Sequence, residues 1–179
     1  MNKGNVLPTQ LFNQMAITFR SGTNQDKYKL QQLGLKSYGQ FKTVLTEENW
    51  NKMHNFLIAE DSYTDLLERS KCFVCESGSD LIGMAYLVPN GNPTEIFRKE
   101  WSYIRMVGAD PDFTGNGIGK KLVQLCINHA KETNEKIVAL HTSEFMNSAR
   151  YIYENLGFRE EKELEEMFGK KYWLYLLAI

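Results

Sequence analysis

Hydrophobic residues recur at both strand and helix spacing along the chain, so the sequence predicts a protein that combines the two. Polar and apolar residues alternate over Ile17–Arg20, which predicts a first strand after a loose terminal arm at residues 1–15. Helical spacing follows over Asp26–Tyr38 and Glu47–Ser70. The second stretch should divide near Glu60, because the Glu-Asp-Ser run that begins there offers a new N-cap.

The rest of the chain is predicted to contain further strands and helices and to end in a hairpin. A polar turn at Ser77–Asp80 separates two apolar runs and predicts another hairpin. The polar and aromatic connection from Pro89 to Glu100 is either a loop that carries specificity or a solvated turn. The remaining predicted elements are strands at 72–76, 81–88, 101–107 and 137–142, helices over 118 to about 134 and 149–156, and paired strands at 158–166 and 171–179.

The stretch 101–122 carries the most informative chemistry. It begins with aromatic and β-branched residues and then meets a glycine and a proline, which is typical of a buried strand that stops. Gly115, Gly117 and Gly119 follow, and they leave backbone amides unscreened by side chains. Because apolar residues recur at helical spacing from Ile118, these amides lie at a helix N-terminus, which favours a bound phosphate.

Two common phosphate-binding motifs do not fit this turn. With Gly119 and Lys120 as its Gly-Lys pair, a Walker A motif needs glycine at 114 and Ser or Thr at 121, where the chain has Thr114 and Lys121. A dinucleotide fingerprint that starts at Gly115 needs glycine in place of Lys120 and a preceding βαβ unit. A plain tight turn remains the alternative for a lone glycine cluster.

The strand, the proline and the Gly-x-Gly-Ile-Gly turn that opens an amphipathic helix resemble the acetyl-CoA-binding motif of the GNAT superfamily of N-acetyltransferases. Residues 153–158, Tyr-Glu-Asn-Leu-Gly-Phe, resemble the family's second signature, Y-x-x-x-G-F. The resemblance covers mainly residues 72–179. It implies one α/β (α+β) domain over 1–179, with a mixed, mostly antiparallel sheet of about seven strands and helices on both faces.

The resemblance also implies where acetyl-CoA binds. In the family two neighbouring parallel strands, here 101–107 and 137–142, splay apart and admit the pantetheine. Gly108 suits a bulge that frees backbone N–H groups, and in the family such amides bind the acyl carbonyl. The expected donors of hydrogen bonds to that carbonyl are therefore Val107 and Ala109. The expected acetyl-CoA contacts are Val107, Ala109, Thr114, Gly115, Asn116, Gly117, Ile118, Gly119, Lys120, Asn147 and Tyr153.

Two positions in this region depart from the family pattern. Thr114 stands where the family usually has Arg or Gln, which removes a side-chain phosphate contact but leaves the amides. Met146 stands where relatives often carry an Asn that contacts coenzyme A, and the neighbouring Asn147 is the expected substitute.

Tyr153 is the predicted general acid. Its hydroxyl has an ordinary pKa of about 10, so it is protonated at neutral pH and able to protonate a departing thiolate. The position matches the family's catalytic tyrosine, and a core aromatic is the alternative. The base is not evident, because relatives often carry Glu where this chain has Tyr103. Glu100, Glu144, a water chain or an amine that arrives neutral remain open.

Composition and charge narrow the partners. The 21 basic and 22 acidic residues give a net charge of -1, so electrostatics offers no case for nucleic acid as a partner. The start of the chain is unlike a signal peptide, and the longest apolar run, Tyr172–Ile179, is too short to cross a bilayer. We therefore expect a cytoplasmic protein that does not bind membranes.

Cysteine and histidine usage points away from disulfides and metals. Cys72, Cys75 and Cys126 are an odd number without an export signal. Cys72 and Cys75 lie three apart in a predicted strand, so their side chains point to opposite faces and do not form a metal pair. The three histidines are scattered, and we expect no metal.

The predicted activity is transfer of an acetyl group from acetyl-CoA to a primary amine, by direct attack in a ternary complex. A non-catalytic acyl-CoA-binding module would keep the glycine turn without depending on Tyr153, and a nucleotide-binding protein is the weaker alternative. The acceptor is open between small-molecule amines and protein amines, and members of the family often form homodimers. Five aromatic residues of the amino-terminal helical region fit either the core or the acceptor site: Tyr38, Phe41, Trp50, Phe56 and Tyr63.

Overall fold

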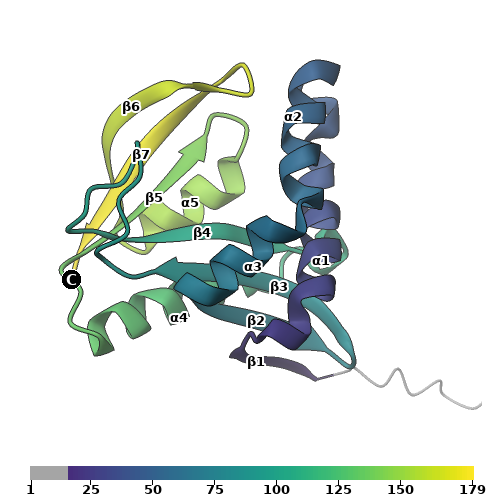
Figure 1. The fold of residues 1–179 in the computed structure, drawn as a ribbon, viewed down its shortest axis with the longest axis horizontal. Helices are drawn as coiled ribbons and strands as arrows, with labels where there is room; N and C mark the ends of the chain where they lie inside the picture. Colours follow the sequence, from purple (N-terminus) through teal and green to yellow (C-terminus); the bar gives the residue numbers. More distant parts are fainter. Residues whose placement is uncertain (1–15) are drawn as a thin grey trace, which may run out of the picture.

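The computed structural model describes residues 16–179, which fold around one seven-stranded sheet (Figure 1). The predicted loose arm at 1–15 lies outside the described residues. The strand order is β1-β2-β3-β4-β5-β7-β6, which confirms the predicted mixed sheet of about seven strands. The strands are Ile17–Ser21 (β1), Lys71–Ser77 (β2), Asp80–Val88 (β3), Ser102–Ala109 (β4), Ile137–Ser143 (β5), Arg159–Met167 (β6) and Lys170–Ala178 (β7).

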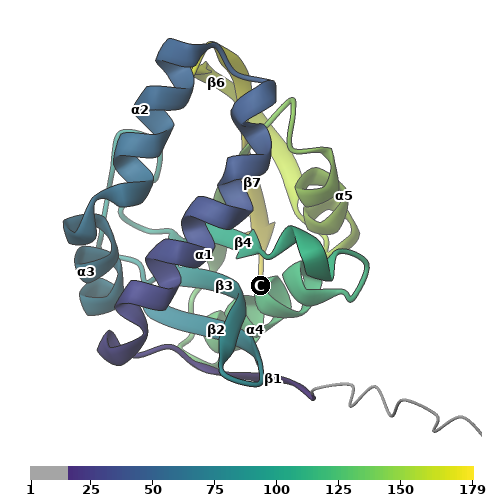
Figure 2. The ribbon, with the colours of Figure 1, turned by 90° about the vertical axis from the view of Figure 1, so that its right-hand side faces the viewer.

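Helices cover both faces of the sheet, as predicted (Figures 1 and 2). One apolar core lies between the sheet and the first three helices, and a second lies on the other face below the last two. The helices are Lys27–Gly39 (α1), Glu47–Ile58 (α2), Glu60–Arg69 (α3), Ile118–Glu132 (α4) and Asn147–Asn155 (α5), with short 3-10 turns at Asn24–Asp26 (η1), Gln40–Thr43 (η2) and Pro111–Phe113 (η3).

The pairing of β4 with β5 is the parallel step in an otherwise antiparallel sheet. The two strands are paired only at Ser102 with Val138 and at Tyr103 with Ala139, after which their ladder ends. Beyond Tyr103 the two backbones are no longer held together by ladder hydrogen bonds. The sheet therefore has the opening that we expected between these two strands.

A β-bulge interrupts β4, but not where the sequence predicted it. Arg105 pairs with Tyr86 and Gly108 pairs with Met84, so Met106 and Val107 together face one residue of β3. Met106 has φ 52°, a left-handed conformation that nothing in its residue type signals. The expected bulge at Gly108 was therefore wrong. A glycine fits there because a Cβ would lie only 3.0 Å from the Ser37 Oγ.

The break between α2 and α3 also differs in its chemistry. It falls at Ala59, which has an extended backbone (φ -72°, ψ 110°) and precedes Glu60. No side chain caps the start of α3, so the predicted N-cap in the Glu-Asp-Ser run was wrong. By contrast, the Thr46 hydroxyl accepts a hydrogen bond from the Asn49 amide and caps α2 in the usual way.

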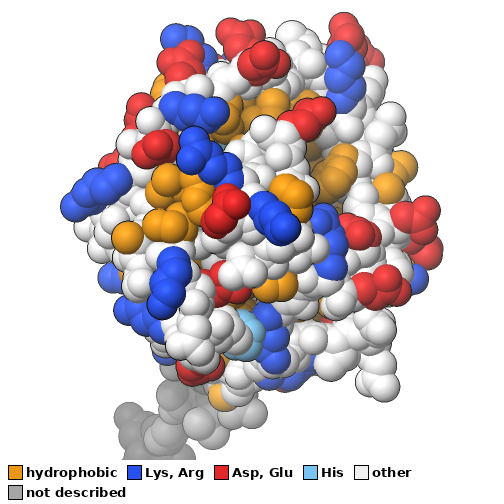
Figure 3. Space-filling view, turned by 60° about the vertical axis from the view of Figure 1, so that its left-hand side comes forward, with side chains coloured by type: hydrophobic (Ala, Val, Ile, Leu, Met, Phe, Trp, Pro, Cys, Tyr) orange, Lys and Arg blue, Asp and Glu red, His pale blue; other side chains and the backbone are white. Residues whose placement is uncertain are grey.

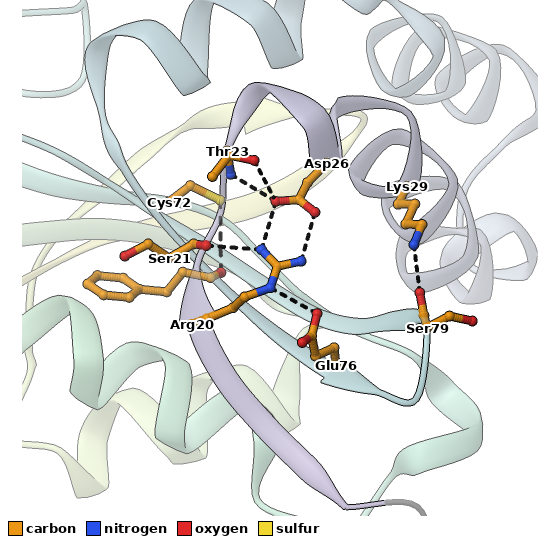
Figure 4. Close-up of polar contacts among 9 residues, drawn as sticks. Arg20, Ser21, Thr23, Asp26, Lys29, Cys72, Glu76 and Ser79 are labelled. Atoms are coloured by element: carbon orange, nitrogen blue, oxygen red, sulfur yellow. Dashed lines mark hydrogen bonds and ion pairs between the residues drawn. The ribbon is translucent and has the colours of Figure 1, made fainter.

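An ion-pair network joins the edge strand β1 to the rest of the molecule (Figure 4). The Arg20 guanidinium donates to both carboxylate oxygens of Asp26 at 2.8 Å, and its Nε donates to Glu76 on β2 at 2.9 Å. Thr23 adds its amide and hydroxyl to the same Asp26 carboxylate. These bonds fix the turn from β1 into α1.

The three cysteines are buried, and charged side chains of both signs are mixed on the surface that Figure 3 shows. Cys72 packs in the core below α1–α3 and Cys75 in the core below α4 and α5, so the two thiols face opposite ways, and Cys126 is buried too. Acidic and basic side chains are interspersed over the face seen in Figure 3. Within residues 16–179, no helix has both the length and the apolar character needed to span a bilayer.

Candidate active site

The connection from β4 to α4 presents a row of backbone N–H groups without protein partners. In the described part of the chain, the amides of Gly115, Gly117, Ile118, Gly119 and Lys120 donate to no other protein group. The first four N–H groups of a helix lack partners within the helix, and the helix dipole adds partial positive charge there. The N-terminus of α4 thus offers the donors that a phosphate needs.

The glycines of this turn are required by conformation and not by crowding. Gly115 has φ 88° and Gly117 has φ 69°, both in the region that side chains rarely adopt. A Cβ at either position would meet nothing within 4 Å, so the space beside the turn is open. Gly119 differs, because its Cβ would contact Ile152 of α5 at 3.5 Å and its φ is ordinary. This contact brings the turn next to the helix that carries Tyr153.

The polar side chains of the turn fold back onto their own backbone. The Thr114 hydroxyl donates to the Pro111 carbonyl at 2.7 Å, and the Asn116 side-chain amide donates to the Phe113 carbonyl at 2.9 Å. The backbone amide of Asn116 also points to Phe113, at 3.4 Å. These bonds shape the turn, so the side chains leave its free amides accessible.

Three consecutive residues of α1 form hydrogen bonds and ion pairs with the end of β4 and the start of the turn. Lys36 forms ion pairs with Asp110 and Asp112, at 2.7 and 2.6 Å. The Ser37 hydroxyl accepts the Ala109 amide at 3.1 Å, and the Tyr38 hydroxyl donates to the Val107 carbonyl at 3.3 Å. The sequence predicted none of these contacts, because they join residues more than 68 positions apart.

The predicted hydrogen-bond donors on β4 are therefore not equivalent. Ala109 has its N–H occupied by Ser37 in this structure. Val107 lies within the bulge, half-buried, where the strand is distorted. Their roles toward an acyl carbonyl stay predictions, and the local geometry favours Val107.

Tyr153 lies on α5, inside the core that α4 and α5 form with the sheet. The side chain is 5% exposed, and its ring meets Phe158 edge-on at 6.0 Å between centroids. Burial, with a smaller effect from the neighbouring Tyr38, raises the pKa of the Tyr153 hydroxyl above its usual range. The hydroxyl is therefore fully protonated at neutral pH, as a general acid requires.

Family comparison decides how this geometry is interpreted. Residues 37–158, which are more than half of the chain, match the Acetyltransferase (GNAT) family. The chain belongs to the GNAT acetyltransferase family. Its sequence is 30% identical over 150 residues to an uncharacterized N-acetyltransferase of Methanocaldococcus jannaschii, covering 82% of this chain and 62% of that protein.

One further relative is similar in sequence, and one solved structure shares the fold. Human N-alpha-acetyltransferase 30 is 34% identical over 93 residues, which cover 52% of this chain and 25% of that protein. The PaiA N-acetyltransferase of Thermoplasma acidophilum, solved with coenzyme A, shares the fold with a TM-score of 0.72 at 15% identity, covering 89% of this chain and 98% of that one. The chain spans 62% or less of the length of the two relatives matched by sequence.

One further side chain, that of His141, lies beside the strand opening, and the sequence analysis did not predict this position. His141 lies on β5, two residues beyond the last residue paired with β4, and on the same face as Tyr103. Its Nδ1 is buried without a hydrogen-bond partner, and its ring lies between Phe97 and Tyr172, with centroids 5.8 and 5.6 Å away. A lone histidine in a strand gives no sequence signal of this placement.

The environment of His141 keeps its imidazole neutral. Burial, assisted by the positive charge of Arg105, lowers the pKa of His141 to about 4. Arg105 is half-buried on β4, and burial lowers its pKa in turn. The opening between β4 and β5 thus has a neutral imidazole on one side and a cation nearby.

The other candidates for the base fit less well. Glu144 is exposed, and its carboxylate accepts the Lys171 amide at 3.1 Å in the loop before α5. Glu100 is exposed in the connection before β4. Tyr103, at the position where relatives often have Glu, is fully buried and accepts a hydrogen bond from Arg69 at 3.1 Å.

The remaining predicted site residues divide between the turn and α5. Lys120 is exposed at the start of α4, and Asn147 is exposed as the first residue of α5. Of the five helical aromatic residues, Tyr63 belongs to the core, whereas Tyr38 and Phe41 are half-buried and pack edge-on at 6.1 Å. In residues 16–179 no group of three or more His, Cys, Asp and Glu side chains is arranged to hold a metal ion.

Proposed function

We propose that this protein is an N-acetyltransferase that takes its acetyl group from acetyl-CoA and transfers it to an amine. The observation that carries the proposal is the set of unpartnered amides of Gly115 and of residues 117–120, next to a parallel strand pair that opens after Tyr103. Membership of the GNAT family and the fold shared with a coenzyme A complex support the same activity.

The residues of the site supply what the reaction needs. The free amides of the turn bind the diphosphate of acetyl-CoA. The amine nitrogen attacks the thioester carbonyl, and the N–H of Val107 stabilises the negative charge that develops on the oxygen. The carbon–sulfur bond then breaks, and Tyr153 donates its hydroxyl proton to the departing thiolate.

We propose that His141 accepts the proton of the attacking amine through a water molecule. Its imidazole is neutral at pH 7, because its pKa is lowered to about 4. Arg105, whose charge contributes to the lowered pKa of His141, also disfavours an ammonium ion nearby and so favours the neutral amine that can attack. In the net reaction the amine loses one proton and the thiol gains one, so no further reactant is needed.

The acceptor belongs to one of two classes. N-alpha-acetyltransferase 30, by its name, acts on an alpha-amino group, and this supports a protein N-terminus as acceptor. Small-molecule amines remain the second class.

An amine-panel assay tests the proposal. Acetyl-CoA is incubated with the protein and with peptide N-termini, lysine-containing peptides, polyamines and amino acids, and thiol release is measured. We expect release with one class only. Saturable binding of acetyl-CoA without thiol release from any amine would instead support a non-catalytic acyl-CoA-binding module. Stabilisation by ATP or NAD in preference to acetyl-CoA, in a thermal-shift assay, would support a nucleotide-binding protein.

A further inference from the structure

Two carboxylates stand immediately before the free amides of the glycine turn. Asp110 directly follows β4, and its side chain is 10% exposed. One of its oxygens accepts the Asp112 amide at 3.0 Å and caps the short turn η3. Asp112 is itself 75% exposed. Both lie within five residues of Gly115, so their negative charges oppose an arriving diphosphate when salt does not screen them.

Lys36 neutralises this pair from a distant part of the chain. Its ammonium lies 2.7 Å from the Asp110 carboxylate and 2.6 Å from that of Asp112. Hydrogen bonds to Asp110 and then Asp112 raise the pKa of Lys36, so the ammonium stays charged throughout the neutral range. One ammonium group is thus paired with two carboxylates.

The turn has few other ways to offset these charges. Thr114 stands before the first glycine and uses its hydroxyl within the turn, so that position brings no cation. Lys120 and Lys121 come later, in the first turn of α4. The carboxylate of Asp110 has a structural role of its own, because it caps η3.

We propose that Lys36 is a positioning residue for acyl-CoA binding. It cancels part of the negative charge of Asp110 and Asp112 beside the diphosphate site and ties the turn to α1. This inference rests on the proposed function. It means that α1 contributes to coenzyme affinity in addition to the glycine turn.

The test is the variant Lys36→Met, which keeps the length of the side chain and removes its charge. We expect the KM for acetyl-CoA to rise about fivefold at low ionic strength, the effect of about one close charge contact in water. The rise should shrink at high salt, and kcat should change less than about twofold. In the double variant Lys36→Met with Asp112→Asn, most of the affinity should return.

Two controls separate charge from structure. Lys52→Met changes the net charge equally but breaks only the exposed pair with Glu48 on α2, so its KM should equal that of the wild type. Asp112→Asn alone keeps the pair of Lys36 with Asp110 and should lower the KM about twofold at low salt. This measurement does not depend on whether a Lys36 variant folds.

The inference is overturned if Lys36→Met has a wild-type KM at low salt. It is also overturned if the KM rises equally at all salt concentrations without rescue by Asp112→Asn, which indicates a purely structural role. Calorimetric titration with coenzyme A separates this failure from that of the proposed function. If the wild type binds no coenzyme A, the proposed function fails, whereas equal binding by wild type and variant contradicts only the role of Lys36.

Discussion

Tyr153 carries a hydroxyl at a position where packing alone would be satisfied by phenylalanine. Its ring is 5% exposed and packs against Phe158, so Tyr153→Phe should leave the free energy of unfolding within about 1 kcal/mol. Because the proton for the thiolate is lost, kcat should fall about 100-fold while the Kd for coenzyme A is retained. Steady-state kinetics and calorimetry measure the two quantities. Unchanged turnover would make Tyr153 a packing residue.

His141 should make the stability of the protein depend on pH. Its pKa is lowered from 6.5 to about 4 in the folded state, so the unfolded chain binds the proton first as the pH falls. The imidazole should therefore cost stability between pH 6.5 and 4, by up to about 3 kcal/mol.

The variant His141→Gln measures this cost. Urea unfolding at pH 7, 5.5 and 4 should show a smaller loss of stability for the variant than for the wild type, and turnover at pH 7 should fall with the imidazole gone. His54→Gln, on α2, controls for the loss of an imidazole outside the site. Parallel pH profiles for wild type and His141→Gln would contradict the burial argument.

At the scale of elements, the glycine turn offers a matched pair of substitutions. Gly117 has φ 69° and Gly91 has φ 87°, and a Cβ at either position would meet nothing within 4 Å. Alanine at either should cost about 1 kcal/mol through backbone strain. Only Gly117→Ala should also raise the Kd for coenzyme A, by about tenfold, because it distorts and covers the free amides. Calorimetric titration of both variants provides the comparison, and equal Kd values would remove the turn from the binding site.

The elements that sequence predicted well are those with local causes. The turn at Gly115 and Gly117 was predicted from its glycines, which tolerate positive φ, and both residues have that conformation. The bulge at Met106 was missed because methionine carries no such signal, and its φ of 52° is imposed by the surrounding structure.

The contacts of α1 with β4 escaped prediction for a different reason. Ser37 and Ala109 are 72 positions apart, and each belongs to an element that is complete without the other. The same holds for His141, whose placement beside the strand opening depends on where β4 and β5 part. Sequence periodicity states which face of an element is buried, but it does not state which residues of another element lie against that face.

For the whole molecule, the two cores explain how the site is held. Residues of α1 reach the end of β4 from one face of the sheet, and Tyr153 approaches from the other face. Tyr38, which packs against the core on the first face, adds a smaller contribution than burial to the raised pKa of Tyr153. The turn from β1 into α1 therefore matters to the site although it lies far from it in sequence, because it sets where α1 begins.

Arg20→Met tests that turn. The substitution leaves the Asp26 carboxylate, with a side chain only 9% exposed, without the guanidinium that binds both its oxygens. Since Arg20 is itself 39% exposed, water screens part of the loss, and we expect the free energy of unfolding at pH 7 to fall by about 2 kcal/mol. Lys52→Met, which breaks an exposed pair, should cost less than about 0.5 kcal/mol.

The pH dependence identifies the cause of that loss. Hydrogen bonding to Arg20 holds the pKa of Asp26 at about 2, below its ordinary value of 3.8. A carboxyl whose pKa is lower in the folded state stabilises the protein above the unfolded pKa, and this stabilisation disappears as the pH falls through the folded pKa. The difference between wild type and Arg20→Met should therefore be constant from pH 7 to about 4 and narrow toward pH 2. Urea unfolding at pH 7, 4 and 3 measures it, and a difference that does not narrow would mean that Arg20 acts through packing instead of charge.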